Sequence, residues 1–114
     1  MNLLRRALDR FRSGDIRWIK GGMGDGHNGR CLLGGVFGIN WDLVQDMRFP
    51  EEDEHMWPLY EVLREQYPNK VRKADDRLAV PGCIAQFNDR WLMTQDEVER
   101  ILEKAAVRLE ERVE

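Results

Sequence analysis

The stretch from residue 94 to residue 113 constrains the fold more than any other part of the sequence. Its apolar residues recur every three or four positions, which is the period of an amphipathic helix. The members of this apolar stripe are Val98, Ile101, Leu102, Ala105, Ala106, Leu109 and Val113. A helix with one long apolar face needs other elements to cover that face, so we expect this helix to organise a mainly α-helical domain.

The start of this helix carries a capping box. Thr94 and Glu97 have the required spacing, and acidic residues crowd the first turn, where the helix dipole favours them. We expect the Thr94 hydroxyl to accept a hydrogen bond from the backbone N–H of Glu97. The Glu97 carboxylate is expected to reach back to the backbone N–H of Thr94.

Four more segments show helical patterns or helix-start signals. They are residues 2–12, 31–39, 58–67 and 81–89. Pro58 and Pro81 suit the first turn of a helix, because the missing N–H of proline needs no partner there. Residues 31–39 are apolar on every side, and their small residues favour a central buried helix. The sequence therefore predicts one domain over residues 1–114, a compact bundle of about five helices.

Residues 16–31 break this helical pattern. Residues 16–20 alternate and are rich in β-branched and aromatic side chains, which is typical of a short strand. Five of the nine residues from 21 to 29 are glycine, so this part is expected to be a loop. A short β-hairpin is compatible with residues 16–31.

The glycine loop leaves two interpretations open. Its order Gly24-Asp25-Gly26-His27-Asn28-Gly29 is that of a G-x-G-x-x-G phosphate loop. A ligand or anion site, or the site of a small enzyme, would use Gly24, Gly26, His27, Arg30, Cys31, Asn88 and Asp89. The other interpretation is a turn that needs positive φ angles. We favour the turn, because a dinucleotide-binding fold needs several parallel strands and this chain has one segment with strand character.

The cysteines and histidines do not have the spacing of a known metal or disulfide framework. Cys31 and Cys83 lie in apolar contexts and are expected to be reduced, buried thiols. His27 and His55 have acidic neighbours but no ligand spacing such as H-E-x-x-H. We therefore predict no metal and no cofactor.

The formal net charge of −3 conceals an alternation along the chain. Residues 1–30 carry +4, residues 31–66 carry −6, residues 67–91 carry +2 and residues 92–114 carry −3. The first helix has a basic face of Arg5, Arg6, Arg10 and Arg12, and an acidic stretch contains Asp46, Glu51, Glu52, Asp53 and Glu54. Complementary charge favours the choice of a protein partner, whereas the negative net charge counts against a nucleic-acid binder. These nine residues are the candidate protein contacts.

No apolar run approaches the ~20 residues that span a bilayer. The first six residues also lack the apolar core of a secretory signal. We therefore expect a soluble, cytoplasmic protein.

Four short motifs occur in an order that resembles a small uncharacterised family from actinobacteria and their bacteriophages. They are Trp18-Ile19-Lys20-Gly21-Gly22, Gly29-Arg30-Cys31-Leu32-Leu33-Gly34, Phe87-Asn88-Asp89 and Thr94-x-x-Glu97-Val98. The resemblance covers about residues 3–109, with Lys20, Gly35 and Phe87 where the family usually has Gln, Ala and Trp. It implies a small helical domain without assigned activity. In such a domain, Asn88 and Asp89 would cap a helix and hold the glycine loop through side-chain hydrogen bonds.

These observations lead to one main functional hypothesis. The protein is expected to be a non-catalytic, phage-encoded accessory protein that binds a host or phage protein. The alternative is the small-molecule or anion site, or small enzyme, at the glycine loop. A homodimer built on exposed Trp side chains and the surface of the last helix is compatible with both.

Overall fold

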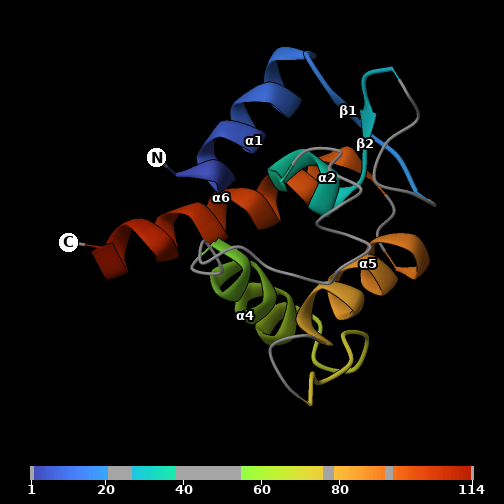
Figure 1. Cartoon of the computed structure of the whole chain (residues 1–114), viewed down its shortest axis with the longest axis vertical. Helices are drawn as coiled ribbons and strands as arrows, with labels where there is room; N and C mark the ends of the chain where they lie inside the picture. The colour runs from blue at the N-terminus through green and yellow to red at the C-terminus, as the bar shows by residue number, and fades with distance from the viewer. Residues whose placement is uncertain (1, 21–26, 38–54, 76–78, 92–93, 114) are drawn as a thin grey trace.

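The computed structural model describes residues 2–20, 27–37, 55–75, 79–91 and 94–113. Within these ranges the chain forms five helices and two very short strands (Figure 1). The helices are α1 (Leu3–Ser13), α2 (Leu32–Phe37), α4 (Met56–Gln66), α5 (Val80–Arg90) and α6 (Gln95–Val113), and the strands are β1 (Arg17–Trp18) and β2 (Gly29–Arg30). The prediction of a mainly α-helical fold is confirmed.

Helix α6 organises the packing, as its apolar stripe predicted. It has 19 residues and lies against both α1 and α4. The stripe is buried from Val98 to Leu109. The Thr94 hydroxyl accepts from the Glu97 N–H at 3.3 Å, which confirms half of the capping box. The Glu97 carboxylate accepts from the Thr94 hydroxyl, also at 3.3 Å, instead of from its backbone N–H.

Helix α1 covers one side of α6 with an apolar face of Leu4, Ala7, Leu8 and Phe11. Asn2 begins the helix, because its Oδ1 accepts from the backbone N–H groups of residues 4 and 5. Gly14 ends it with a φ of 83°, a left-handed conformation that glycine adopts without strain. The helix predicted over residues 2–12 is therefore confirmed to within one residue at each end.

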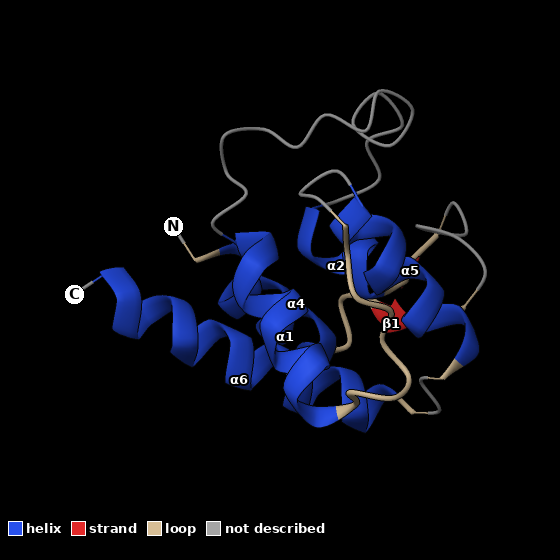
Figure 2. Cartoon of the chain, turned by 90° about the horizontal axis from the view of Figure 1, so that it is seen from below, coloured by secondary structure: helices blue, strands red, loops and turns tan. Residues whose placement is uncertain are grey.

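Helices α2 and α5 lie side by side next to the group formed by α1, α4 and α6 (Figure 2). Their buried residues join the same hydrophobic cluster as those of the other helices. Leu32, Ile84 and Phe87 are among the largest fully buried side chains in the described part of the chain. This cluster positions the polar residues that surround the start of α2.

The predicted hairpin near residues 16–31 is corrected to a parallel pair of strands. Arg17 pairs with Gly29 and Trp18 with Arg30. The Arg17 N–H donates to the Asn28 carbonyl at 2.8 Å, and the Ile19 N–H to the Arg30 carbonyl at 2.9 Å. Strand β2 leads almost directly into α2, so its direction follows from the docking of α2 against α1 and α5.

Several helix boundaries differ from the prediction by one or two residues. Helix α4 begins at Met56, two residues before Pro58, and α5 begins at Val80, one residue before Pro81. Both prolines still lie in a first turn. Helix α5 also runs one residue beyond the predicted end at residue 89, and the Asn88 side chain bonds to other elements. The end of the predicted helix at residues 38–39 and the acidic stretch at residues 42–54 lie outside the described residues.

Candidate functional site

Asn88 is the best-connected polar residue of the predicted ligand set. Its side chain is completely buried on α5. Its Oδ1 accepts from the Trp18 indole Nε1–H at 2.8 Å and from the Leu32 backbone N–H at 3.0 Å. Leu32 is the first residue of α2, so Asn88 caps that helix. The capping role that the resemblance implied for Asn88 is confirmed.

Both hydrogens of the Asn88 amide nitrogen also have acceptors. Nδ2 donates to the Ile19 carbonyl at 3.3 Å and to the Asp89 Oδ1 at 3.1 Å. A primary amide offers two donors and two acceptor positions, and all four are occupied here. Asn88 therefore ties β1, α2 and α5 together.

Cys31 immediately precedes α2 and caps it as well. Its Sγ accepts from the Gly34 N–H at 3.3 Å, the bond that a serine or threonine makes at a helix start. Cys31 is buried, and Cys83 is buried on α5. The prediction that both cysteines are buried is confirmed.

Arg30 and His27 occupy the chain just before Cys31. The Arg30 Nη1 donates to the carbonyls of His27 at 2.9 Å and Gly29 at 2.8 Å. The His27 side chain is exposed. Gly24 and Gly26 lie outside the described residues, as does the part of the glycine loop that Asn88 and Asp89 were expected to hold. The structure thus gathers Cys31, Asn88 and Asp89 around the start of α2.

Gln95 is a connecting residue that the sequence analysis missed. Its Oε1 accepts from the Trp18 backbone N–H at 3.0 Å, and its Nε2 donates to the Phe11 carbonyl at 3.2 Å. Gln95 therefore joins the end of α1 and strand β1 to the start of α6. A glutamine next to a capping box carries no signal in the sequence for such distant contacts.

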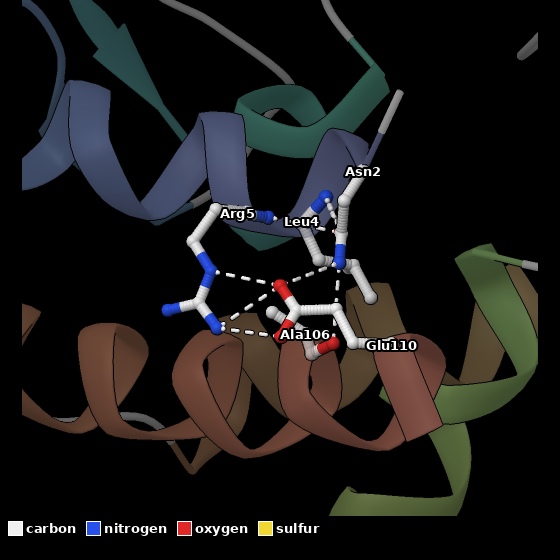
Figure 3. Close-up of polar contacts among 5 residues, drawn as sticks. All are labelled: Asn2, Leu4, Arg5, Ala106 and Glu110. Atoms are coloured by element: carbon white, nitrogen blue, oxygen red, sulfur yellow. Dashed lines mark hydrogen bonds and ion pairs between the residues drawn. The ribbon is translucent and has the colours of Figure 1, made fainter. Parts of the chain in front are cut away.

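The basic face of α1 lies partly against α6. Arg5 makes a two-bond contact with Glu110, from Nε to Oε1 and from Nη2 to Oε2, both at 3.1 Å (Figure 3). Asn2 adds to this contact, because its Nδ2 donates to the Ala106 carbonyl at 3.1 Å and to the Glu110 Oε1 at 3.4 Å. Arg5 therefore connects two helices of the protein itself.

Arg12 also lies against α6, whereas Arg6 and Arg10 do not. Arg12 contacts Glu103 at 3.2 Å and Glu99 at 3.6 Å, both on α6. Arg10 pairs with Asp15 at 2.7 Å. Arg6 is exposed on the outer side of α1, in a shallow hollow that Arg5, Asp9 and Arg10 also line. The acidic candidates Asp46, Glu51, Glu52, Asp53 and Glu54 lie outside the described residues.

A second set of ion pairs joins α6 to α4. Arg112 binds Glu61 through two contacts of 2.7 and 2.6 Å. Arg108 binds Glu65 in the same two-bond manner, with one contact at 3.0 Å. The hydrogen bond from Arg108 lowers the pKa of Glu65 below its usual 4.5 and raises the pKa of Arg108. Arginine and glutamate thus hold α4 and α6 together along their solvent side.

Comparison with known proteins places the chain in a family. The model of one protein family matches residues 1–108, and this family is described as a family of unknown function (DUF6197). The chain belongs to this family. No curated protein and no solved structure matches it. The match confirms the expectation of a family without assigned activity, and the actinobacterial or phage source of this DUF6197 chain stays a prediction.

In the described part of the DUF6197 chain, two aromatic residues remain on the surface. Trp91 is 43% exposed at the end of α5, with the Lys70 ammonium 5.3 Å from its ring centre. Trp57 is 36% exposed near the start of α4 and meets the Tyr60 ring edge-on. Large exposed rings of this kind are enriched at protein interfaces.

Among the described residues, no group of three or more His, Cys, Asp or Glu side chains is arranged to hold a metal ion. None of the described helices combines the length and the apolar composition that a membrane span requires.

Proposed function

We propose that this DUF6197 chain is a non-catalytic accessory protein that acts by binding another protein. The observation that carries the proposal is the complete use of Asn88 in structural hydrogen bonds. Cys31 and Arg30 are used similarly, in a helix cap and in backbone contacts. The residues best suited to ligand chemistry thus contribute to holding the fold, which favours function through the surface.

The motif order in the sequence extends this proposal to the source of the protein. We infer a gene of an actinobacterial phage, a host or phage protein as partner, and action in the cytoplasm of the host. The support is the resemblance of four ordered motifs, from Trp18 to Val98, to proteins of that source.

The outer side of α1 is the contact surface that we propose. Arg6 lies exposed there, beside the partly exposed Arg10. Guanidinium groups at a surface favour encounter with an acidic protein by electrostatic steering. The partner is therefore expected to present carboxylates to this side of α1.

The test is affinity capture with a matched pair of variants. The tagged wild-type chain, Arg6→Glu and Arg90→Glu are compared in an extract of an actinobacterial host. Arg90 is exposed at the end of α5, so its variant makes the same charge change elsewhere. We expect one protein to be recovered with the wild type and Arg90→Glu and to be lost with Arg6→Glu. Equal recovery with all three chains, or no specific recovery, would contradict the proposed surface.

A ligand screen tests the competing function at the glycine loop. Thermal unfolding is followed with nucleotides, inorganic phosphate and divalent metal ions. A ligand that binds only the folded state raises its stability in proportion to the logarithm of ligand concentration. A stabilisation of several degrees by one of these compounds, abolished by a substitution at His27, would overturn the non-catalytic proposal.

A further inference from the structure

The side of α6 that faces away from the core forms one wall of a groove with α4. Val62 and Tyr67 line the groove from α4 and the residue after it, and Val107 lines it from α6. Val107 is 40% exposed, whereas the apolar stripe of α6 is buried from Val98 to Leu109. The groove therefore offers a small apolar contact in the middle of a charged helix surface.

Two charged residues flank Val107 on this side of α6. Lys104 precedes it by three positions and Glu111 follows it by four, so both lie one turn away on the same side of the helix. Both side chains are exposed, and neither makes an ion pair with any residue in the described part of the chain. Their neighbours Glu103 and Arg108, in contrast, are paired with α1 and α4.

We propose that a second copy of this chain docks on this surface, with the two α6 helices antiparallel and Val107 near the two-fold axis. A two-fold interface uses the same patch on both copies, so each contact occurs twice. In an antiparallel pair centred at Val107, Lys104 of one copy meets Glu111 of the other. The reverse contact follows by symmetry.

The distances along the helix fit this arrangement. With a rise of ~1.5 Å per residue, Lys104 and Glu111 lie about 5 and 6 Å on either side of Val107. The two positions are therefore nearly equivalent under a two-fold rotation.

The order of charges along α6 favours a second copy of this chain, and not a different protein, as the partner at this surface. A groove with a single sign of charge would select an oppositely charged partner. Here the positive Lys104 and the negative Glu111 flank the exposed Val107. When a second copy is placed antiparallel, each charge therefore faces the opposite charge. Because the pairs are exposed, the association should depend on salt. This interface lies on α6 and is independent of the protein contact proposed on α1.

Charge reversal with a mixing step tests the arrangement. Sedimentation velocity is measured over a range of concentrations for the wild type, Lys104→Glu, Glu111→Lys and the double variant. The wild type is expected to pass from monomer to dimer as concentration rises, and added salt should weaken the dimer. Each single variant should stay monomeric, because like charges then face each other, and the double variant should regain the dimer.

The decisive measurement is an equimolar mixture of the two single variants. One copy then carries two acidic residues at these positions and the other carries two basic residues, so the antiparallel arrangement predicts a heterodimer. Asp9→Lys, on the outer side of α1, is the control and should dimerise as the wild type does. A wild type that is monomeric at all concentrations would overturn the proposal. A dimer that both single variants retain, or a mixture that stays monomeric, would overturn it equally.

Discussion

Asn88 shows how one buried side chain can satisfy polar groups from several elements at once. Its amide satisfies the Trp18 indole and the first N–H of α2 while it also holds the Ile19 carbonyl. Buried polar groups are costly when they lack partners, so each of these groups depends on Asn88.

Replacement of Asn88 by alanine should therefore be strongly destabilising. Asn88→Ala leaves the Trp18 Nε1–H and the Leu32 N–H without their acceptor, at ~1–3 kcal/mol for each unsatisfied group. We expect the free energy of unfolding, measured by urea denaturation, to fall by ~2–4 kcal/mol. Asn69→Ala, at an exposed turn position, is the control. Similar free energies of unfolding for the two variants would show that the hydrogen bonds of Asn88 do not stabilise the fold.

The capping role of Cys31 predicts a difference in stability between its serine and alanine variants. Serine keeps a hydrogen-bond acceptor for the Gly34 N–H, and alanine removes it. Cys31→Ala should be less stable than Cys31→Ser by ~1 kcal/mol, the usual contribution of an N-cap side chain. Thermal unfolding of the two variants measures the difference, and an alanine variant at least as stable as the serine variant would contradict the cap.

At the scale of elements, the close approach of α2 to α1 depends on Gly35. A Cβ atom at this position would lie 2.6 Å from Cε2 and 2.8 Å from Cζ of Phe11. Such distances are too short for carbon atoms, so the two helices can lie this close only without a side chain there.

Two glycine substitutions in helices should therefore have opposite effects. Gly35→Ala should destabilise the protein by ~1–3 kcal/mol, because the methyl group displaces Phe11 from the core. A Cβ atom added at Gly82, on α5, would have no atom within 4 Å. Gly82→Ala should therefore stabilise the protein by up to ~1 kcal/mol through helix propensity. Urea denaturation of both variants tests the pair, and a shift of the same sign in both would refute the packing argument.

Local patterns in the sequence were sufficient to predict most of the helices. The periodicity of residues 94–113 predicted α6 and its buried side, and the resemblance predicted the capping role of Asn88. The parallel pairing of β1 and β2 was not predictable in this way, because long-range docking of α2 sets the strand direction. Periodicity also showed that Arg5 faces outward from α1, but it contained no sign of Glu110, 105 positions away.

At the scale of the whole molecule, α6 is bound on both sides by ion pairs of opposite polarity. Helix α6 packs against both α1 and α4 (Figure 1). It offers glutamates to the arginines of α1 and arginines to the glutamates of α4. Each exposed pair contributes little by itself, whereas two-bond arginine contacts with well-defined geometry contribute more.

The ion pairs with α4 should make stability depend on pH in the acid range. Because Arg108 lowers the pKa of Glu65 in the folded protein, this carboxylate contributes stability above its unfolded pKa of about 4.5. That contribution is lost as the pH falls through the lower folded pKa. Urea denaturation at neutral and acid pH should show a smaller loss of stability for Glu65→Gln than for the wild type.

The control for this pH dependence is Asp9→Asn. Asp9 is exposed on α1 and has no ion pair with a described residue. Its variant should lose stability toward acid pH as the wild type does. Parallel pH profiles for Glu65→Gln and the wild type would contradict the role of the Glu65 pair.

The cap that Asn88 provides also has a consequence for the order of folding. The described part of helix α2 has six residues, fewer than the ~12–15 that an isolated helix needs to persist in water. Its first N–H finds its acceptor 56 positions further along the chain. We therefore expect the α2 segment to become ordered late in folding, after the part of the chain that carries α5 has docked.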